Sequence, residues 1–145
     1  MHLNHINLCA SNVPALASTL VNHFNYRLAD SGAIPRPNDD EDSHFALVIG
    51  ADGSELVITQ ITAPPADQSA YPQGFHFGLI QPSREAVYAK HDELTTAGLT
   101  PGKINDGFQV WGATWTAFYC PLGDGLEIEI NYRTTSDFLD TRAST

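Results

Sequence analysis

Two histidines stand at matching places in the two halves of this sequence, and two glutamates follow an Asp-Gly pair near its end. His5 and His76 are 71 positions apart (76 − 5), and Glu127 and Glu129 follow Asp124-Gly125. Two imidazoles and one carboxylate suit a divalent transition metal, and three protein ligands leave positions open for water or substrate. A lone strand histidine is more often hydrogen-bonded structure, but two at duplicated positions favour a metal site. Spacing alone does not choose between Glu127 and Glu129, because both share one face of a strand.

The histidines belong to an internal duplication. Residues 4–8 are echoed by residues 75–79, and Asp52-Gly53 is echoed by Asp124-Gly125, 72 positions later (125 − 53). Two landmarks with nearly one offset predict a fold of two similar modules. We expect a single domain at 1–145, with a first module at 2–62, a second module at 73–132 and a tail at 133–145.

Each half predicts the order strand, helix, strand, strand, strand. Residues alternate between apolar and polar where strands are expected, and apolar residues recur at helical spacing where helices are expected. The fold class is therefore α+β, with two βαβββ modules forming a cupped mixed sheet, helices on the outside and a polar cavity inside. The predicted elements are a strand at 3–10, a helix at 13–25, a short strand at 26–30, a loop at 31–43, a hairpin turning at Asp52-Gly53, a linker at 63–72, a strand at 75–79, a helix from Pro82-Ser83 to Gly98, a weak strand or loop at 99–110, and strands at 110–120 and 126–130.

Composition excludes several classes of protein. The net charge is −10 with only seven Lys and Arg, so the chain lacks the clustered cations that a nucleic-acid binder needs. No apolar run approaches the roughly 18–20 residues that span a bilayer. The first residues lack the layout of a secretory signal, so a cytoplasmic protein without a membrane segment is expected. Cys9 and Cys120 are isolated and are expected to be buried thiols rather than a disulfide.

Residues 118–130 carry the most specific motif. They read FYCPLGDGLEIEI, which resembles the Phe-Tyr, Asp-Pro-Asp-Gly and Glu-Leu signature of the vicinal oxygen chelate superfamily. This is the superfamily of glyoxalase I, bleomycin-resistance proteins, fosfomycin-modifying enzymes and extradiol dioxygenases, and the resemblance covers about residues 2–132. It implies His5, His76 and Glu129 as metal ligands, because the family's ligand Glu lies four residues after the Gly.

Departures from the family patterns narrow the activity. The fourth ligand of glyoxalase I falls on Val57 (129 − 72), which cannot bind metal. Fosfomycin-modifying enzymes need cations around a phosphonate, and residues 106–109 offer none. Extradiol dioxygenases share the ligand set and a tyrosine matched by Tyr119, but residues 111–118 lack their additional histidine.

The resulting hypothesis is a metal-dependent enzyme whose candidate site residues fall into three groups. One divalent metal (Fe, Mn, Zn, Co or Ni) would bind a small substrate through neighbouring oxygens, for lyase, isomerase or ring-cleaving dioxygenase chemistry. A homodimer is expected, and the sequence leaves open whether the site forms in one chain or across two. The candidates are His5, His76 and Glu129 as metal ligands, Tyr119 and Glu129 as catalytic groups, and Asn7, His44, Trp111, Trp115 and Tyr119 as substrate-binding residues.

Two alternatives remain open. A bleomycin-resistance-like protein would sequester a small cationic drug between aromatic walls without catalysis, and the acidic balance is compatible with this. A non-catalytic accessory domain would bind neither metal nor small molecules. Metal content separates the enzyme from both alternatives.

Overall fold

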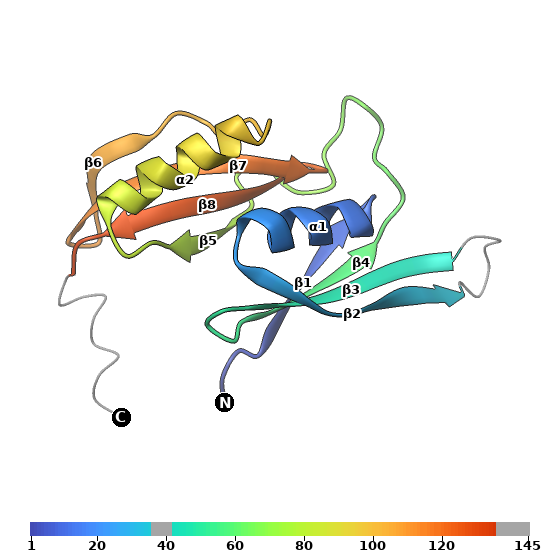
Figure 1. Ribbon diagram of the computed structural model, residues 1–145. Helices are drawn as coiled ribbons and strands as arrows, with labels where there is room; N and C mark the ends of the chain where they lie inside the picture. The colour runs from blue at the N-terminus through green and yellow to red at the C-terminus, as the bar shows by residue number, and fades with distance from the viewer. Residues whose placement is uncertain (36–41, 136–145) are drawn as a thin grey trace. The chain divides into compact units, whose positions relative to one another are not determined.

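The computed structural model describes residues 1–35 and 42–135 and shows two compact units (Figure 1). Unit 1 contains Met1–Pro72 together with Leu122–Gly125, and unit 2 contains Gln73–Pro121 and the chain from Leu126 onward. Most of the predicted tail, from residue 136, and residues 36–41 of the predicted loop lie outside the described residues.

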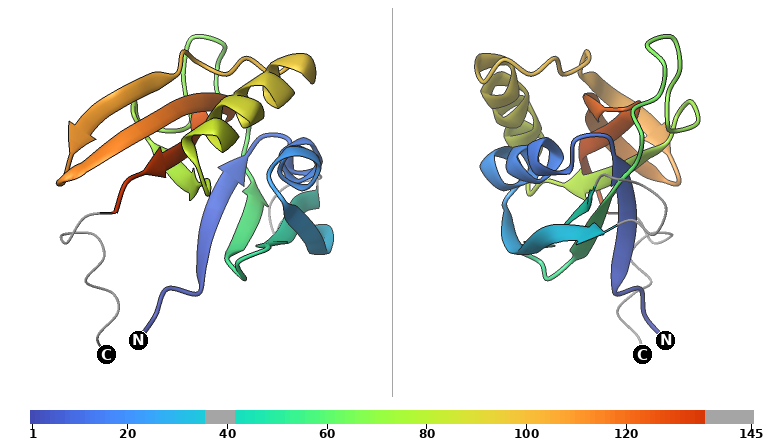
Figure 2. Two further views of the ribbon diagram at one scale, coloured as in Figure 1. Left: turned by 60° about the vertical axis from the view of Figure 1, so that its left-hand side comes forward. Right: turned by 90° about the vertical axis from the view of Figure 1, so that its right-hand side faces the viewer.

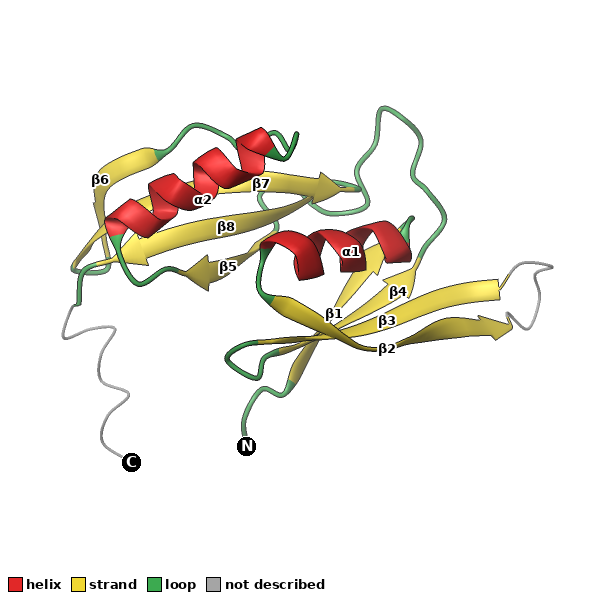
Figure 3. Cartoon of the chain, viewed as in Figure 1, coloured by secondary structure: helices red, strands yellow, loops and turns green. Residues whose placement is uncertain are grey.

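Both halves of the chain have the order strand, helix, strand, strand, strand, which confirms the two βαβββ modules and the α+β class (Figure 3). Each module forms its own four-stranded mixed sheet, in the orders β1-β4-β3-β2 and β5-β8-β7-β6. The elements are β1 (His5–Ala10), α1 (Val13–His23), β2 (Tyr26–Pro35), β3 (Asp42–Gly50), β4 (Glu55–Gln60), β5 (His76–Ile80), α2 (Arg84–Thr96), β6 (Asn105–Val110), β7 (Ala113–Gly123) and β8 (Leu126–Arg133).

The duplication extends to the strand register. The first and last strands of each module are parallel neighbours, with His5 opposite Glu55 in one and His76 opposite Glu127 in the other. The partners of each pair are therefore related by the same offsets of 71 and 72 positions (76 − 5 and 127 − 55). Because alternate residues of a strand face opposite sides, this register determines which side chains share a face.

The helices begin at duplicated caps. The Asn12 side chain accepts a hydrogen bond from the Ala15 amide at 3.1 Å, and the Ser83 hydroxyl accepts one from the Ala86 amide at 3.1 Å. Such caps satisfy donors that a helix N-terminus leaves unpaired. Each helix lies against one face of its own module's sheet: α1 packs against β2, β3 and β4, and α2 packs against β8 (Figure 2).

Apolar side chains between helix and sheet form the core of each unit. In unit 2 the largest fully buried side chain is Phe118 of β7, whose ring meets that of His91 edge on at 5.0 Å between ring centroids. The buried apolar residues are Leu8, Ala10, Val13, Leu16, Ala17, Leu20, Phe24, Tyr26, Ala46, Val48, Leu56 and Ile58 in unit 1, and Val87, Leu94, Ala113, Trp115, Ala117, Phe118, Cys120, Leu126, Ile128 and Ile130 in unit 2.

The turn between β7 and β8 belongs to unit 1. Two positive φ angles, 56° at Asp124 and 84° at Gly125, form this turn, and Asp-Gly is a favoured pair for such turns. The Asp124 carboxylate accepts hydrogen bonds from the amide and the hydroxyl of Ser11, both at 2.7 Å. The Asp124 carbonyl also accepts one from the Ala70 amide at 2.9 Å. The second module thus supplies a carboxylate that fixes the start of α1 in unit 1.

Two boundary predictions are wrong. The predicted loop at 31–43 begins too early, because β2 continues through Gly32 and pairs with β3 as far as Pro35 opposite Asp42. Pairing with a neighbouring strand outweighs the local turn preference of Gly and Pro at this edge strand. The strand predicted at 110–120 begins later, at Ala113, because Trp111 and Gly112 have positive φ angles of 51° and 71° and turn the chain between β6 and β7.

Both cysteines are free thiols, Cys120 buried and Cys9 partly buried, as the sequence predicts. Within the described parts of the chain, neither helix is long and apolar enough to cross a bilayer.

Phe118 gives a direct test of the unit 2 core. We expect Phe118→Ala to lower the free energy of unfolding by about 3–5 kcal/mol, because it removes a fully buried ring and leaves a cavity. Leu3→Ala is the control, since Leu3 is 80% exposed and its truncation should change stability by less than about 0.5 kcal/mol. Chemical denaturation followed by circular dichroism measures both. Equal stability of the two variants would contradict this packing.

Candidate metal centre

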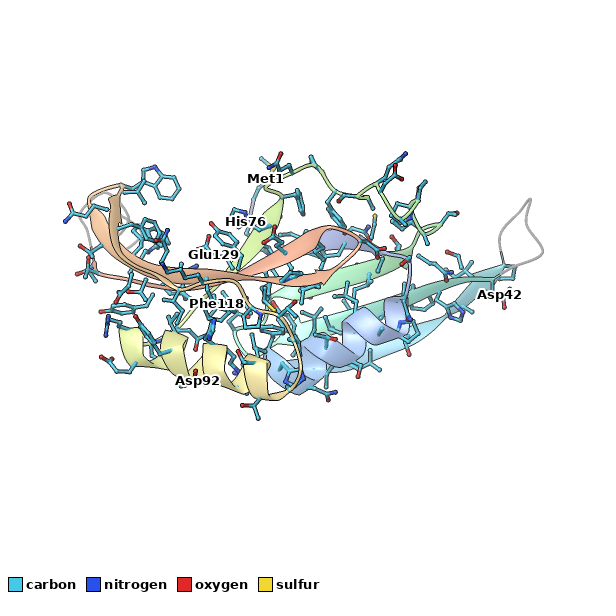
Figure 4. The ribbon with its side chains drawn as sticks, turned by 90° about the horizontal axis from the view of Figure 1, so that it is seen from above. Met1, Asp42, His76, Asp92, Phe118 and Glu129 are labelled. Atoms are coloured by element: carbon cyan, nitrogen blue, oxygen red, sulfur yellow. The ribbon has the colours of Figure 1, made fainter. Side chains whose placement is uncertain are left out.

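A cavity of about 310 Å³ opens on the sheet of unit 2. His76 and Glu129 lie on the side of the sheet away from α2, whereas Phe118 lies on the α2 side (Figure 4). All four strands of this sheet contribute to the cavity, and one residue comes from the β6–β7 turn. Its walls are formed by His76, Gly78, Phe108, Val110, Trp111, Trp115, Tyr119, Glu129 and Asn131.

His76 is oriented by the backbone just before its strand. Its Nδ1 lies 2.9 Å from the carbonyl oxygen of Gly74. A carbonyl can only accept, so Nδ1 carries the proton in this contact and a neutral ring has its lone pair on Nε2. That Nε2 atom lies 3.3 Å from Oε2 of Glu129. The imidazole therefore presents a nitrogen lone pair toward a carboxylate oxygen.

Glu129 is held by neighbours on the same face. Asn131 donates a hydrogen bond from Nδ2 to Oε1 of Glu129 at 2.8 Å, which leaves Oε2 facing His76. Asn131 is 8% exposed, and a Cβ at the facing Gly78 would approach its Nδ2 to 3.2 Å. The absent side chain at Gly78 therefore makes room for the Asn131 amide. The sequence analysis missed Asn131, although its position two residues after Glu129 places it on the same strand face.

Tyr119 of β7 is the proton-bearing group beside this pair. Desolvation raises the pKa of its hydroxyl to about 12, with a further contribution from its hydrogen bond to the Glu129 carboxylate. The ring meets His76 edge on, with 5.0 Å between ring centroids. Tyr119 is therefore a neutral donor at ordinary pH, next to the predicted ligands.

The carboxylate within ion-pair distance of His76 is Glu129 rather than Glu127. Glu127 lies directly opposite His76 in the register and lines a smaller neighbouring cavity with Gly74, His76 and Tyr119. The ion-pair distance therefore distinguishes two glutamates that strand parity does not, and the role of Glu129 as a metal ligand stays a prediction.

The predicted residues of unit 1 lie on two different faces. Asn7 donates to the hydroxyl of Thr59 at 3.1 Å, and Nδ1 of His5 lies 2.7 Å from the side-chain oxygen of Asn4. His44, by contrast, shares its face with Ala46, which α1 covers. The structure therefore does not bring His44 and Asn7 to one face of the sheet.

His44 lines a groove of about 570 Å³ between α1 and the β2–β3 hairpin. The duplication accounts for this space. Ala46 stands where the second module has Phe118, 72 positions later (118 − 46), and Ala17 stands where it has Tyr88, 71 positions later (88 − 17). Small side chains in the first module leave open a volume that aromatic side chains occupy in the second.

With each unit taken by itself, no three His, Cys, Asp or Glu side chains converge among residues 1–35 and 42–135. The pair His76 and Glu129 in unit 2 is the part of the predicted ligand set that this structure describes together. His5 as the third ligand stays a prediction from the sequence.

Comparison with known proteins decides the family. The model of the Glyoxalase/Bleomycin resistance protein/Dioxygenase superfamily matches residues 2–130, which is most of the chain. The chain belongs to this superfamily. This match confirms the family resemblance that residues 118–130 indicate. No curated protein matches the sequence of this superfamily member.

Solved structures share the fold of this superfamily member. A possible glyoxalase from Bacillus cereus is 25% identical with a TM-score of 0.62, covering 90% of this chain and 97% of that one. A glyoxylase/bleomycin resistance protein/dioxygenase domain from Frankia is 14% identical with a TM-score of 0.67, covering 92% and 98%. The fosfomycin resistance protein FosX from Listeria monocytogenes, in complex with Mn(II) and a dihydroxypropylphosphonic acid, is 18% identical with a TM-score of 0.66, covering 89% and 90%.

The contact between Tyr119 and Glu129 can be tested by titration. We expect the hydroxyl of Tyr119 to ionise near pH 12 in the native protein and at lower pH in the variant Glu129→Gln. The sign follows because an adjacent carboxylate disfavours the phenolate, so removing its charge favours ionisation. Ultraviolet difference titration against Tyr119→Phe isolates this group from the other tyrosines. An unchanged midpoint in Glu129→Gln would contradict the contact.

Proposed function

We propose that this superfamily member is a metal-dependent enzyme in which His76 and Glu129 hold a divalent transition metal beside Tyr119. The 3.3 Å separation of Nε2 and Oε2 carries the proposal. A charge-assisted hydrogen bond between such groups is shorter, about 2.7–2.9 Å. Two ligand atoms bound at about 2.0–2.2 Å to one tetrahedral ion are about 3.3–3.6 Å apart, so the spacing fits two ligands of a shared metal better than a direct ion pair.

The chemistry of the donors supports the same reading. An imidazole nitrogen and a carboxylate oxygen suit iron, manganese, zinc, cobalt or nickel. The second ring nitrogen of His76 is bonded to a backbone carbonyl, and the second oxygen of Glu129 is bonded to the Asn131 amide. Metal-binding histidines and carboxylates commonly have such outer partners, which fix the tautomer and the orientation of each ligand.

His5 is the proposed third ligand. It occupies the place in β1 that His76 occupies in β5, and its strand has the same parallel register against the last strand of its module. Three ligands would leave room for a small substrate, as a catalytic site requires. The related FosX structure, which contains Mn(II), supports a divalent metal in this fold. We also propose that the protein is a homodimer, and light scattering of the purified protein measures its oligomeric state.

The proposed reaction uses the chain's own groups around the substrate. A bound metal supplies Lewis-acid activation of a substrate that offers two neighbouring oxygens. Tyr119 keeps its proton at neutral pH and can donate a hydrogen bond or a proton to that substrate. Phe108 and Val110 supply apolar walls to the same cavity. Lyase, isomerase and ring-cleaving dioxygenase reactions all begin from such an arrangement.

Drug sequestration without catalysis is the second candidate function. The aromatic residues Phe108, Trp111 and Trp115 that line the cavity, together with the net charge of −10, favour a protein that encloses a small cationic molecule. Such a protein would purify without metal and bind its ligand equally well in the presence of a chelator. Metal dependence therefore separates the two functions.

Metal content tests the proposed ligands one at a time. We expect wild type to retain about one divalent ion per chain after dialysis, and His5→Ala, His76→Ala and Glu129→Ala to lose it, because fewer donors bind the ion weakly. Elemental analysis of the purified variants measures this. His2→Ala is the matched control, since His2 is exposed and lies outside the proposed set. Unchanged metal in both His76→Ala and Glu129→Ala would refute the site, whereas unchanged metal in His5→Ala alone would remove only His5.

Asn131 offers a test of the support for Glu129. We expect Asn131→Leu, which keeps the size but removes the donor, to weaken metal affinity about 10–100-fold. Competition with a chromophoric chelator measures the dissociation constant. Asn22→Leu on the exposed face of α1 is the control and should bind metal like wild type. Equal affinities for the two variants would show that the amide does not position the carboxylate.

A further inference from the structure

Aromatic rings gather at one end of the unit 2 cavity. Trp115 is the fixed member: it is 6% exposed, and its indole nitrogen donates to the carbonyl of Val110 at 3.0 Å. The ring of Phe108 stacks on Trp115 with 6.2 Å between centroids, and the ring of Trp111 meets Trp115 edge on at 5.9 Å. We call Phe108, Trp111 and Trp115 the aromatic corner.

Trp111 is unusual in two independent ways. It lies in the β6–β7 turn with a φ of 51°, a left-handed conformation that bulky residues adopt at a cost in strain. Its side chain is also 60% exposed, although it lines the cavity. Asn before Gly112 would form the same turn without strain and without an exposed indole. Neither the turn nor the core therefore accounts for Trp111.

Phe108 reaches the cavity through an irregularity in β6. The register between β6 and β7 shifts between Asp106 and Phe108, and Gly107 between them has a φ of 78°. Asp106 thereby stands opposite Thr116, and its carboxylate accepts a hydrogen bond from the Thr116 hydroxyl at 2.7 Å. Phe108 stands opposite Trp115. In a regular strand two residues separated by one position face the same side, so the bulge is what places Phe108 in the aromatic corner.

We propose that the aromatic corner binds a planar aromatic ring of the substrate, whose chelating oxygens lie toward His76 and Glu129. The inference rests on the proposed function, since the metal would hold the other end of the same molecule. Exposed indole and phenyl surfaces favour stacked or edge-on contact with a further ring. The two backbone irregularities and the exposed ring of Trp111 all serve this one surface.

The size of the cavity narrows the ligand further. The cavity of about 310 Å³ is at the lower end of small-molecule sites, so it fits one ring with one chelating group. Among the described residues that line it there is no Lys or Arg, and its ionisable side chains are His76, Tyr119 and Glu129. The guanidinium of Arg133 lies over the ring of Trp115, 5.2 Å from its centroid, so the aromatic corner has a cation beside it. The size of the cavity therefore limits the ligand, whereas its lining leaves the charge of the ring open.

Two hydroxamates test the corner, because they bind a metal through the same two oxygens and differ only in a phenyl or a methyl group. The probes are benzohydroxamate and acetohydroxamate, titrated into Co(II)-loaded protein and followed by calorimetry and the Co(II) absorption spectrum. Free Co(II) has its own ratio of affinities for the two hydroxamates. We expect the ratio for the wild-type protein to favour benzohydroxamate about tenfold more than the free ion does.

Variants at Trp111 locate the effect. Trp111→Asn keeps a favourable turn residue before Gly112 and should stay folded, yet lose the extra affinity for benzohydroxamate while binding acetohydroxamate as wild type does. Trp111→Phe should keep most of the preference, because it retains an aromatic ring.

The outcomes separate the two proposals. If wild type binds both hydroxamates without any extra preference for the phenyl group, or if Trp111→Asn weakens both equally or neither, the aromatic corner is overturned while the metal site stands. If the protein takes up no Co(II), or if neither hydroxamate changes the Co(II) spectrum, the proposed function fails and the corner fails with it.

Discussion

In each module the first strand pairs in parallel with the last strand, and this pairing decides which side chains can meet. In β5 and β8 it places Gly78 opposite Glu129. The polar row of β8, which is Glu127, Glu129 and Asn131, points away from α2. The intervening Ile128 and Ile130 are fully buried on the α2 side. Because strand side chains alternate, a slip of one residue would bury carboxylates and expose both isoleucines. Burial of the two isoleucines therefore holds the polar row in place.

The polar row is stabilised as a group rather than residue by residue. The side chain of Glu129 is only 12% exposed, so its charge must be met by donors. The Asn131 amide and the Tyr119 hydroxyl supply two of them, and His76 faces the remaining oxygen. Desolvation raises the pKa of Tyr119, and the same carboxylate raises it further. A cation at this point would satisfy the oxygen that the amide does not occupy.

Much of the fold follows from local patterns. Alternation around His5 and His76, the shared offset and the Asp-Gly turns were enough to predict two βαβββ modules, and the motif at 118–130 was enough to predict the superfamily. The continuation of β2 depends on pairing with a distant strand, which no local pattern records. The turn at Trp111 was missed because tryptophan is not a turn residue, and Phe108 was missed because a bulge reverses its face. Without the family motif, the sequence does not tell which of Glu127 and Glu129 lies against His76, because both glutamates share one strand face. Only the side-chain positions distinguish them.

The carboxylate of Asp124 has a consequence for how the halves of the chain depend on each other. A polypeptide ending at Pro72 would contain every strand of the first module, yet it would leave the amide and hydroxyl of Ser11 without their acceptor. The sequence symmetry therefore does not amount to two self-sufficient fragments. A fragment of the first module alone would have to find another acceptor for two donors just before α1.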